Sequence, residues 1–207
     1  MFLFNYKVLY IMNKIFAILS ALFFMNVLVS FSQDTPVKGP QYEITVKQIS
    51  TENGTATELG KIVIELMPDV APLHVKNFDS LVAVKFYDGT AFHRVIPNFM
   101  IQGGDPNSKS KPRNTWGMGD PSQARVKAEF SSVKHERGIV SMARSNDPNS
   151  ASSQFFIMHG NSPHLDGKYS AFGKTVSGLD VVDKVVAAKR NGENPIDKIE
   201  MTIRKLK

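Results

Sequence analysis

Short segments of β-forming residues, separated by Gly, Pro, Asn and Asp, recur through the sequence from residue 41 to its end. Such segments, bounded by turn residues, are typical of strands in an all-β domain. Many short strands with few helices favour a β-barrel or a β-sandwich. We expect strands at Gln41–Ile49, Lys61–Leu66, Ala91–Val95, Met100–Gly103, Gly138–Ala143, Gln154–Met158, Ala171–Val176 and Ile199–Leu206.

Two segments have the period of an amphipathic helix instead. In Pro68–Val82 the apolar stripe is Val75, Phe78, Leu81 and Val82, and Pro72 suits a first helical turn, where no amide hydrogen bond is lost. In Leu179–Ala188 the stripe is Leu179, Val182, Val185 and Val186. The sequence therefore predicts a mainly β fold with two helices.

The first 32 residues differ from the rest of the chain. Ile15–Phe31 is an almost unbroken apolar run preceded by Lys14, with small residues at Ser30 and Ser32, which is typical of a secretory signal peptide. We expect residues 1–32 to be that signal, with Met12 as a candidate initiator, followed by a linker at residues 33–40 and one domain at 41–207. An uncleaved membrane anchor stays an alternative, because the run has about the shortest length that spans a bilayer.

Composition narrows the function classes further. The chain has no cysteine, which excludes disulfides, thiol catalysis and thiolate metal sites. Its formal net charge is +6, and removal of the signal peptide takes away two lysines and no acidic residue. The remaining charge of about +4 is moderate and gives no case for nucleic acid as a partner.

Three segments carry the chemistry: AFHRVIPNFMIQGGD at 91–105, GIVSMARSNDPNSASSQFFIM at 138–158 and HLDGKYSAFGKTV at 164–176. Alternate residues of a strand share a face, so Met100 lies beside Gln102 and Gln154 beside Phe156. Each strand thus presents an apolar group next to a carboxamide. This arrangement suits a shallow pocket for a proline ring, with hydrogen bonds to the flanking peptide backbone.

The three segments together resemble the cyclophilin family of peptidyl-prolyl cis/trans isomerases, and the resemblance extends from Gln41 to Lys207. It implies a closed eight-stranded antiparallel β-barrel capped by two α-helices, with a substrate groove on the outer wall. It also implies Arg94 as the catalytic residue, no cofactor, and proline-containing unfolded or partly folded polypeptides as partners. The implied substrate-binding residues are Phe99, Met100, Gln102, Ala143, Arg144, Gln154, Phe156, His164, Leu165 and Tyr169.

The chain departs from the family pattern at the groove's rim. His164 stands where well-known members carry tryptophan, Tyr169 replaces a usual histidine, and Arg144 replaces a usual asparagine. Since the indole is a major cyclosporin contact in the family, we expect low sensitivity to that drug. The segment 106–128 lacks the family's usual glycine-rich run and contains Trp116, so a secondary specificity pocket is not readable from sequence.

Other functions agree less well with the sequence than an isomerase does. The five histidines have no metal-ligand spacing, so we expect no metal site. Ser141, His159 and Asp166 supply the residue types of a hydrolase triad, but no G-x-S-x-G elbow accompanies them. A proline-binding holdase that uses the same groove with little turnover stays the alternative function. The resemblance suggests a monomer, and the export signal suggests an exported protein, in the periplasm if the source is Gram-negative, in contact with a membrane only through an uncleaved signal.

Overall fold

The computed structural model describes residues 39–206, so the expected signal peptide and most of the expected linker lie outside the described residues. The strands are β1 (Gln41–Ile49), β2 (Ala56–Leu66), β3 (Thr90–Ala91), β4 (Arg94–Ile96), β5 (Met100–Gly103), β6 (Ile139–Met142), β7 (Phe155–Met158), β8 (Ala171–Ser177), β9 (Arg190–Asn191), β10 (Asn194–Pro195) and β11 (Lys198–Lys205). The helices are α2 (Pro72–Ala83) and α3 (Leu179–Ala187), with short 3₁₀ turns at Pro106–Ser108, Arg113–Thr115 and Pro163–Leu165.

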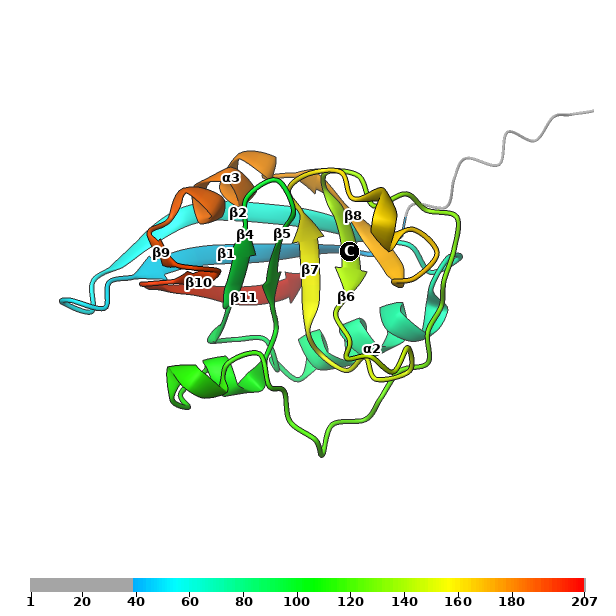
Figure 1. Ribbon diagram of the computed structural model, residues 1–207, viewed down its shortest axis with the longest axis horizontal. Coiled ribbons are helices and arrows are strands. Elements are labelled where there is room, and N and C mark those ends of the chain that lie inside the picture. Colours follow the sequence, from blue (N-terminus) through cyan, green and yellow to red (C-terminus); the bar gives the residue numbers. More distant parts are fainter. Residues whose placement is uncertain (1–38, 207) are drawn as a thin grey trace, which may run out of the picture. The chain divides into compact units, whose positions relative to one another are not determined.

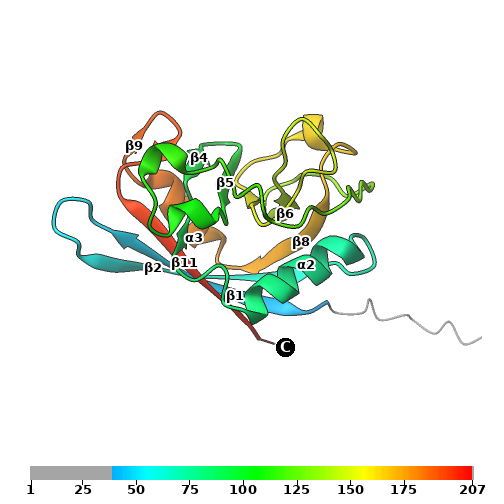
Figure 2. The same ribbon diagram turned by 90° about the horizontal axis from the view of Figure 1, so that it is seen from below.

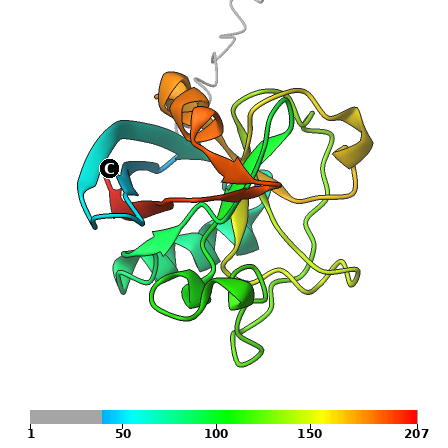
Figure 3. The same ribbon diagram turned by 60° about the vertical axis from the view of Figure 1, so that its left-hand side comes forward.

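One antiparallel sheet forms the body of the domain, in the order β3-β11-β1-β2-β8-β6-β7-β5-β4. Its two edge strands, β3 and β4, are consecutive in the chain and only Phe92 and His93 lie between them. The Phe92 amide donates to Ile199 O on β11 at 2.8 Å, and the His93 amide donates to Gln102 O on β5 at 3.0 Å. The sheet therefore curls until one bent segment, residues 90–96, joins its first and last strands (Figure 3).

This topology confirms the expected cyclophilin-like β fold, with differences in the bounds of the strands, since β2 begins at Ala56 rather than at Lys61. The expected single strand Ala91–Val95 is two short strands, β3 and β4, because the chain bends at Phe92 and His93 to pass from β11 to β5. Counting that bent segment as one strand gives the expected eight. The sequence did not predict the small hairpin β9–β10, whose two-residue strands are too short to show a period.

Both helices lie where the sequence predicts them. Pro72 stands in the first turn of α2, and the helix buries His74, Val75, Phe78 and Val82. It begins later than expected, at residue 72, because residues 68–70 form a turn. The helices lie at opposite ends of strands β4, β5, β7 and β6 (Figure 1), and α2 runs beside β8 and β11 (Figure 2). They cover the two ends of the curled sheet.

Strands β5 and β7 separate two buried clusters of apolar side chains. The inner cluster fills the curled sheet, and its aromatic members are Tyr42, Phe78, Tyr87, Phe92, Phe155 and Phe172. The outer cluster lies on the other face and consists of Met100, Phe156, Met158 and Leu165, with Ile96, Phe99, Ile139, Ala143 and Tyr169 packed around them. Alternate residues of each strand go to opposite clusters, as the pleat of a strand requires.

Residues 39–206 contain neither a membrane-spanning helix nor a cluster of metal-ligating side chains. No helix in this part of the chain is both long and apolar enough to cross a membrane. Nor do three or more metal-ligating side chains converge anywhere in the same range.

Candidate active site

The outer cluster is the floor of an open cavity of about 370 Å³, here called the groove cavity. Met100 and Phe156 face it from the adjacent strands β5 and β7, where Gln102 is the direct cross-strand partner of Phe156. Phe156 is only 4 % exposed, so its ring is held firmly although it borders the cavity. The cavity is lined by His93, Arg94, Phe99, Met100, Gln102, Trp116, Gly117, Ala143, Arg144, Phe156, Leu165, Tyr169, Glu193 and Asn194.

Arg94 lies on the edge strand β4, directly opposite Gln102 on β5. Its Nε donates to the Glu193 carboxylate at 2.5 Å, and its Nη1 donates to Gln102 Oε1 at 3.4 Å. A guanidinium has five N–H donors, so three of them have no acceptor among residues 39–206. The chain therefore presents a cation with free hydrogen-bond donors at the side of a cavity whose floor is apolar.

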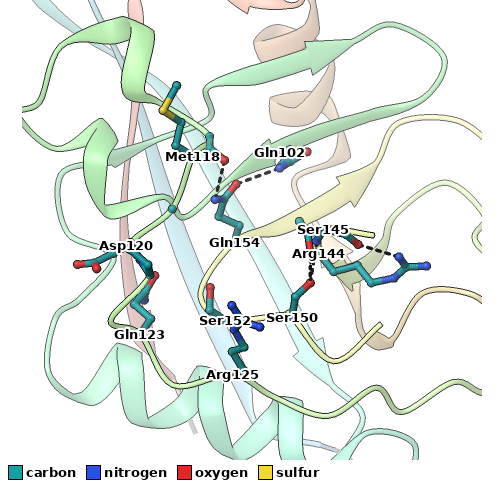
Figure 4. Close-up of a pocket in the computed structure, with 14 residues that line it drawn as sticks. Gln102, Met118, Asp120, Gln123, Arg125, Arg144, Ser145, Ser150, Ser152 and Gln154 are labelled. Carbon is teal, nitrogen blue, oxygen red and sulfur yellow. Dashed lines mark hydrogen bonds between the residues drawn. The ribbon is translucent and has the colours of Figure 1, made fainter. Parts of the chain in front are cut away.

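A row of carboxamides continues from Arg94 across the wall. Gln102 Nε2 donates to Gln154 Oε1 at 3.0 Å, and Gln154 Nε2 donates to Gly117 O at 3.1 Å. Gln154 faces a second cavity of about 410 Å³, here called the loop cavity, which shares Gln102, Gly117, Ala143 and Arg144 with the groove cavity (Figure 4). The polar row thus forms the boundary between two neighbouring recesses.

The geometry matches a known family. The sequence model described as "Cyclophilin type peptidyl-prolyl cis-trans isomerase/CLD" matches residues 48–207, most of the chain. The chain belongs to the cyclophilin family. It is a peptidyl-prolyl cis/trans isomerase, an enzyme that accelerates rotation about Xaa-Pro bonds.

The chain is similar to proteins from both a bacterium and a human. A probable peptidyl-prolyl cis-trans isomerase of Brucella suis is 43% identical over 169 residues, which cover 77% of this chain and 86% of that protein. Peptidyl-prolyl cis-trans isomerase-like 3 of Homo sapiens is 42% identical over 132 residues, which cover 62% of this chain and 78% of that protein. These names agree with the family assignment.

Solved structures agree as well. The crystal structure of a cyclophilin type peptidyl-prolyl cis-trans isomerase from Cryptosporidium parvum superposes with a TM-score of 0.66 at 31% identity, and covers 81% of this chain and 98% of that chain. A structure of that protein in the presence of the dipeptide Ala-Pro superposes with a TM-score of 0.64 at 30% identity, and covers 79% of this chain and 99% of that chain.

The rim of the cyclophilin groove carries the residues that depart from the family pattern. The Arg144 guanidinium lies over the Tyr169 ring at 4.4 Å and donates to Lys168 O at 2.9 Å, so its side chain folds along the rim. Tyr169 in turn meets Phe156 edge-on, with ring centroids 5.9 Å apart. His164 packs on Phe99, with ring centroids 5.7 Å apart. These contacts fix the width of the groove on the side away from Arg94.

A buried polar layer supports the floor from behind. The His135 ring stacks on Phe156, and its Nε2 contacts Ser141 Oγ at 3.0 Å while its Nδ1 contacts Asp166 at 3.2 Å. Burial lowers the pKa of His135 against the opposing effect of Asp166. The hydrolase triple that the sequence argued against is not assembled here, because His135 and not His159 meets Ser141. Ser141 is 0 % exposed, so it is out of reach of a substrate.

The buried carboxylate of Asp105 holds the loop beside the groove cavity in place by hydrogen bonds. Asp105 follows β5 and accepts hydrogen bonds from the amides of Asn107, Gly117 and Gly119. Gly117 has a φ of +88°, and a Cβ there would lie 3.2 Å from the His93 ring. The turn needs glycine for both reasons, and it brings Trp116 to the mouth of the groove cavity.

The structure brings together most of the residues that the sequence nominated. Nine of them line the groove cavity: Arg94, Phe99, Met100, Gln102, Ala143, Arg144, Phe156, Leu165 and Tyr169. Gln154 lines the adjacent loop cavity, and His164 stands behind Phe99 without lining either cavity. Sequence reasoning missed five lining residues: His93, Trp116, Gly117, Glu193 and Asn194. Trp116, the chain's only tryptophan, offered a signal that could have been used.

Proposed function

We propose that Arg94 is the catalytic residue of this isomerase and that the outer cluster receives the proline ring. The observation that carries the proposal is the position of a guanidinium with free donors at the edge of a cavity that has an apolar floor. Met100, Phe156 and Leu165 supply the buried apolar surface, and the carboxamide of Gln102 lies beside them for the peptide backbone.

The electronic structure of the Xaa-Pro bond explains how a hydrogen-bond donor at this place accelerates rotation about it. Rotation is slow because the nitrogen lone pair is delocalised into the carbonyl, which gives a barrier of about 18–20 kcal/mol. Twisting the bond localises the lone pair on nitrogen. Arg94 then donates an N–H to that lone pair, a hydrogen bond that exists only in the twisted state, so it lowers the barrier rather than tightening substrate binding.

The contribution of the Arg94 hydrogen bond to the rate follows from the free energy of such a bond. A hydrogen bond to a charged group contributes about 1.5–3 kcal/mol, and each 1.36 kcal/mol changes a rate tenfold. Arg94 therefore accounts for about one to two powers of ten. The rest of the acceleration comes from the cavity that grips the ring and from the polar groups that hold the twisted carbonyl.

The test is the cis-to-trans rate of an uncharged Xaa-Pro peptide with residues 33–207 and with Arg94→Ala. We expect kcat/KM to fall about ten- to a hundredfold, with an unchanged urea midpoint. Arg204→Ala is the matched control, since the exposed Arg204 pairs with the largely buried Glu43 on β1 and lies outside both cavities. Wild-type turnover in folded Arg94→Ala would overturn Arg94's role, and peptide binding without acceleration by the wild type would favour the holdase.

We further propose that the enzyme acts on exported polypeptides, in the periplasm of a Gram-negative source, as a monomer. The apolar run Ile15–Phe31 and the small residues before Gln33 support the export, and the moderate charge supports proteins rather than nucleic acids as partners. The intact mass of the protein recovered from the exported fraction tests cleavage after Ser32. Recovery only with detergent would support an uncleaved anchor, and light scattering gives the oligomeric state.

A further inference from the structure

The hairpin β9–β10 delivers one acidic side chain to the catalytic cation. Asn191 pairs with Asn194, which leaves Gly192 and Glu193 as the two-residue turn, and Gly192 supplies the positive φ of +60° that such turns favour. The turn lies against β4, where Glu193 O accepts the Val95 amide at 2.7 Å. Backbone contact therefore fixes the place from which the Glu193 side chain reaches Arg94.

The side-chain contact is short but open to solvent. Glu193 Oε2 accepts from Arg94 Nε at 2.5 Å, and the two side chains are 51% and 40% exposed. Nε is the donor nearest the backbone end of the guanidinium, so an acceptor there orients the plane of the group without occupying its Nη2 donors. On the opposite side, Gln102 meets Nη1 at only 3.4 Å, a weak restraint.

We propose that Glu193 is a positioning residue for the isomerase reaction: it holds the Arg94 guanidinium by Nε so that its remaining donors face the prolyl nitrogen. The inference rests on the catalytic role proposed above for Arg94. A long side chain on an edge strand samples many rotamers when it is free, and the planar fork of arginine directs its donors only when one edge is fixed. Glu193 fixes that edge through its contact with Nε.

The expected effect of replacing Glu193 follows from the solvent exposure of its ion pair with Arg94. Exposed ion pairs are weak, and their strength corresponds to a rate change of about two- to fivefold. A positioning role predicts that this change is in kcat, while KM for the peptide stays within twofold, because Glu193 lies at the edge of the groove cavity and is not part of the outer cluster that receives the proline ring. A merely structural role predicts a lower stability with both constants unchanged in the folded protein.

The dependence of kcat on salt concentration distinguishes an electrostatic role of Glu193 in positioning Arg94 from a role in packing. Charges on a surface are screened over about 10 Å at 0.1 M salt and about 3 Å at 1 M. With an uncharged Xaa-Pro peptide, wild-type kcat should therefore fall over this range by part of the two- to fivefold effect of the pair, because the 2.5 Å contact is shorter than the screening length even at 1 M. Glu193→Gln should be low at both concentrations. Glu193→Asp, one methylene shorter, should recover part of the rate and a corresponding part of the salt dependence.

The experiment measures kcat and KM by exchange NMR for wild type, Glu193→Gln, Arg94→Ala and the double variant. In the Arg94→Ala background the Glu193→Gln change should have no further effect, which is the mark of a residue that acts through its partner. Asp180→Asn is the control, since Asp180 forms an exposed ion pair with Lys184 on α3 and lines neither cavity. It should leave kcat, KM and the salt response unchanged.

The outcomes distinguish the two proposals. Full activity in folded Arg94→Ala would overturn the role of Arg94, and Glu193's with it. A loss in Arg94→Ala together with unchanged kcat and salt response in Glu193→Gln would overturn the role of Glu193 alone. Faster turnover in Glu193→Gln would also overturn it, because Glu193 would then restrain Arg94 in an unproductive orientation.

Discussion

The inner and outer clusters share two strands, β5 and β7, and differ in what closes them. Phe155 and Ile157 of β7 point into the inner cluster, whereas Phe156 and Met158 point into the outer one. The inner cluster is surrounded by the curled sheet and α2. The outer one is left partly uncovered and bordered by Gln102 and Arg94. The sheet thus uses one face for stability and the other for recognition, and neighbouring residues have different tasks.

Substitution at two consecutive positions gives the largest expected contrast. Phe155 is fully buried and packs against Phe78, Tyr87 and Phe92. Phe155→Ala should lower the free energy of unfolding by about 3–5 kcal/mol, since truncating a buried aromatic removes its contacts and leaves a cavity. Urea denaturation measures this loss.

Phe156→Ala is the partner in this comparison. It removes the floor of the groove cavity, so we expect kcat/KM to fall about tenfold or more with a smaller loss of stability than Phe155→Ala, because one side of Phe156 already faces the cavity. Equal loss of stability in the two variants, with activity per folded molecule unchanged in Phe156→Ala, would remove the distinction between the faces.

The strand pattern made this division predictable from sequence, whereas two residues that line the groove cavity from outside the large sheet, Glu193 and Trp116, were not predictable. Alternation in Met100–Gly103 and Gln154–Met158 assigns each residue to a face, and the resemblance identifies Arg94, which lies on the strand next to β5. Glu193 is 99 residues from Arg94 in the chain and lies on a two-residue turn. Trp116 belongs to a segment without periodicity, and its place depends on the buried carboxylate of Asp105. Neither position follows from local propensity.

Acid should weaken both faces, because each rests on a buried neutral histidine. Burial lowers the pKa of His74, which packs on Phe172 and contacts Glu129, and also that of His135, which packs on Phe156 and contacts Asp166. A folded-state pKa below the unfolded value means that the unfolded chain binds more protons at low pH. The stability is therefore complete above about pH 6.5 and is lost as the pH falls through the folded pKa values.

The expected slope is at most about 1.4 kcal/mol per pH unit for each histidine. Urea midpoints between pH 7.5 and 5.5, above the range of ordinary carboxylates, measure it. His135→Gln should reduce the slope by the share of one group, and His74→Gln should do the same from the inner side. A slope that stays the same in both variants would place the titration elsewhere in the chain.

Gln154→Ala has a small expected effect on kcat/KM and tests how far the catalytic region extends beyond the groove cavity. Gln154 bridges Gln102 and Gly117 O at the boundary between the two cavities (Figure 4). A hydrogen bond of this kind contributes about 0.5–1.5 kcal/mol, so loss of the bridge should lower kcat/KM about two- to tenfold, with little change in stability because water can replace the amide. If Gln154→Ala changes only the preference for residues before proline, the carboxamide reads the substrate through the loop cavity. If it also lowers kcat for every peptide, the row from Gln154 through Gln102 to Arg94 acts as one unit, and the catalytic region extends into the loop cavity.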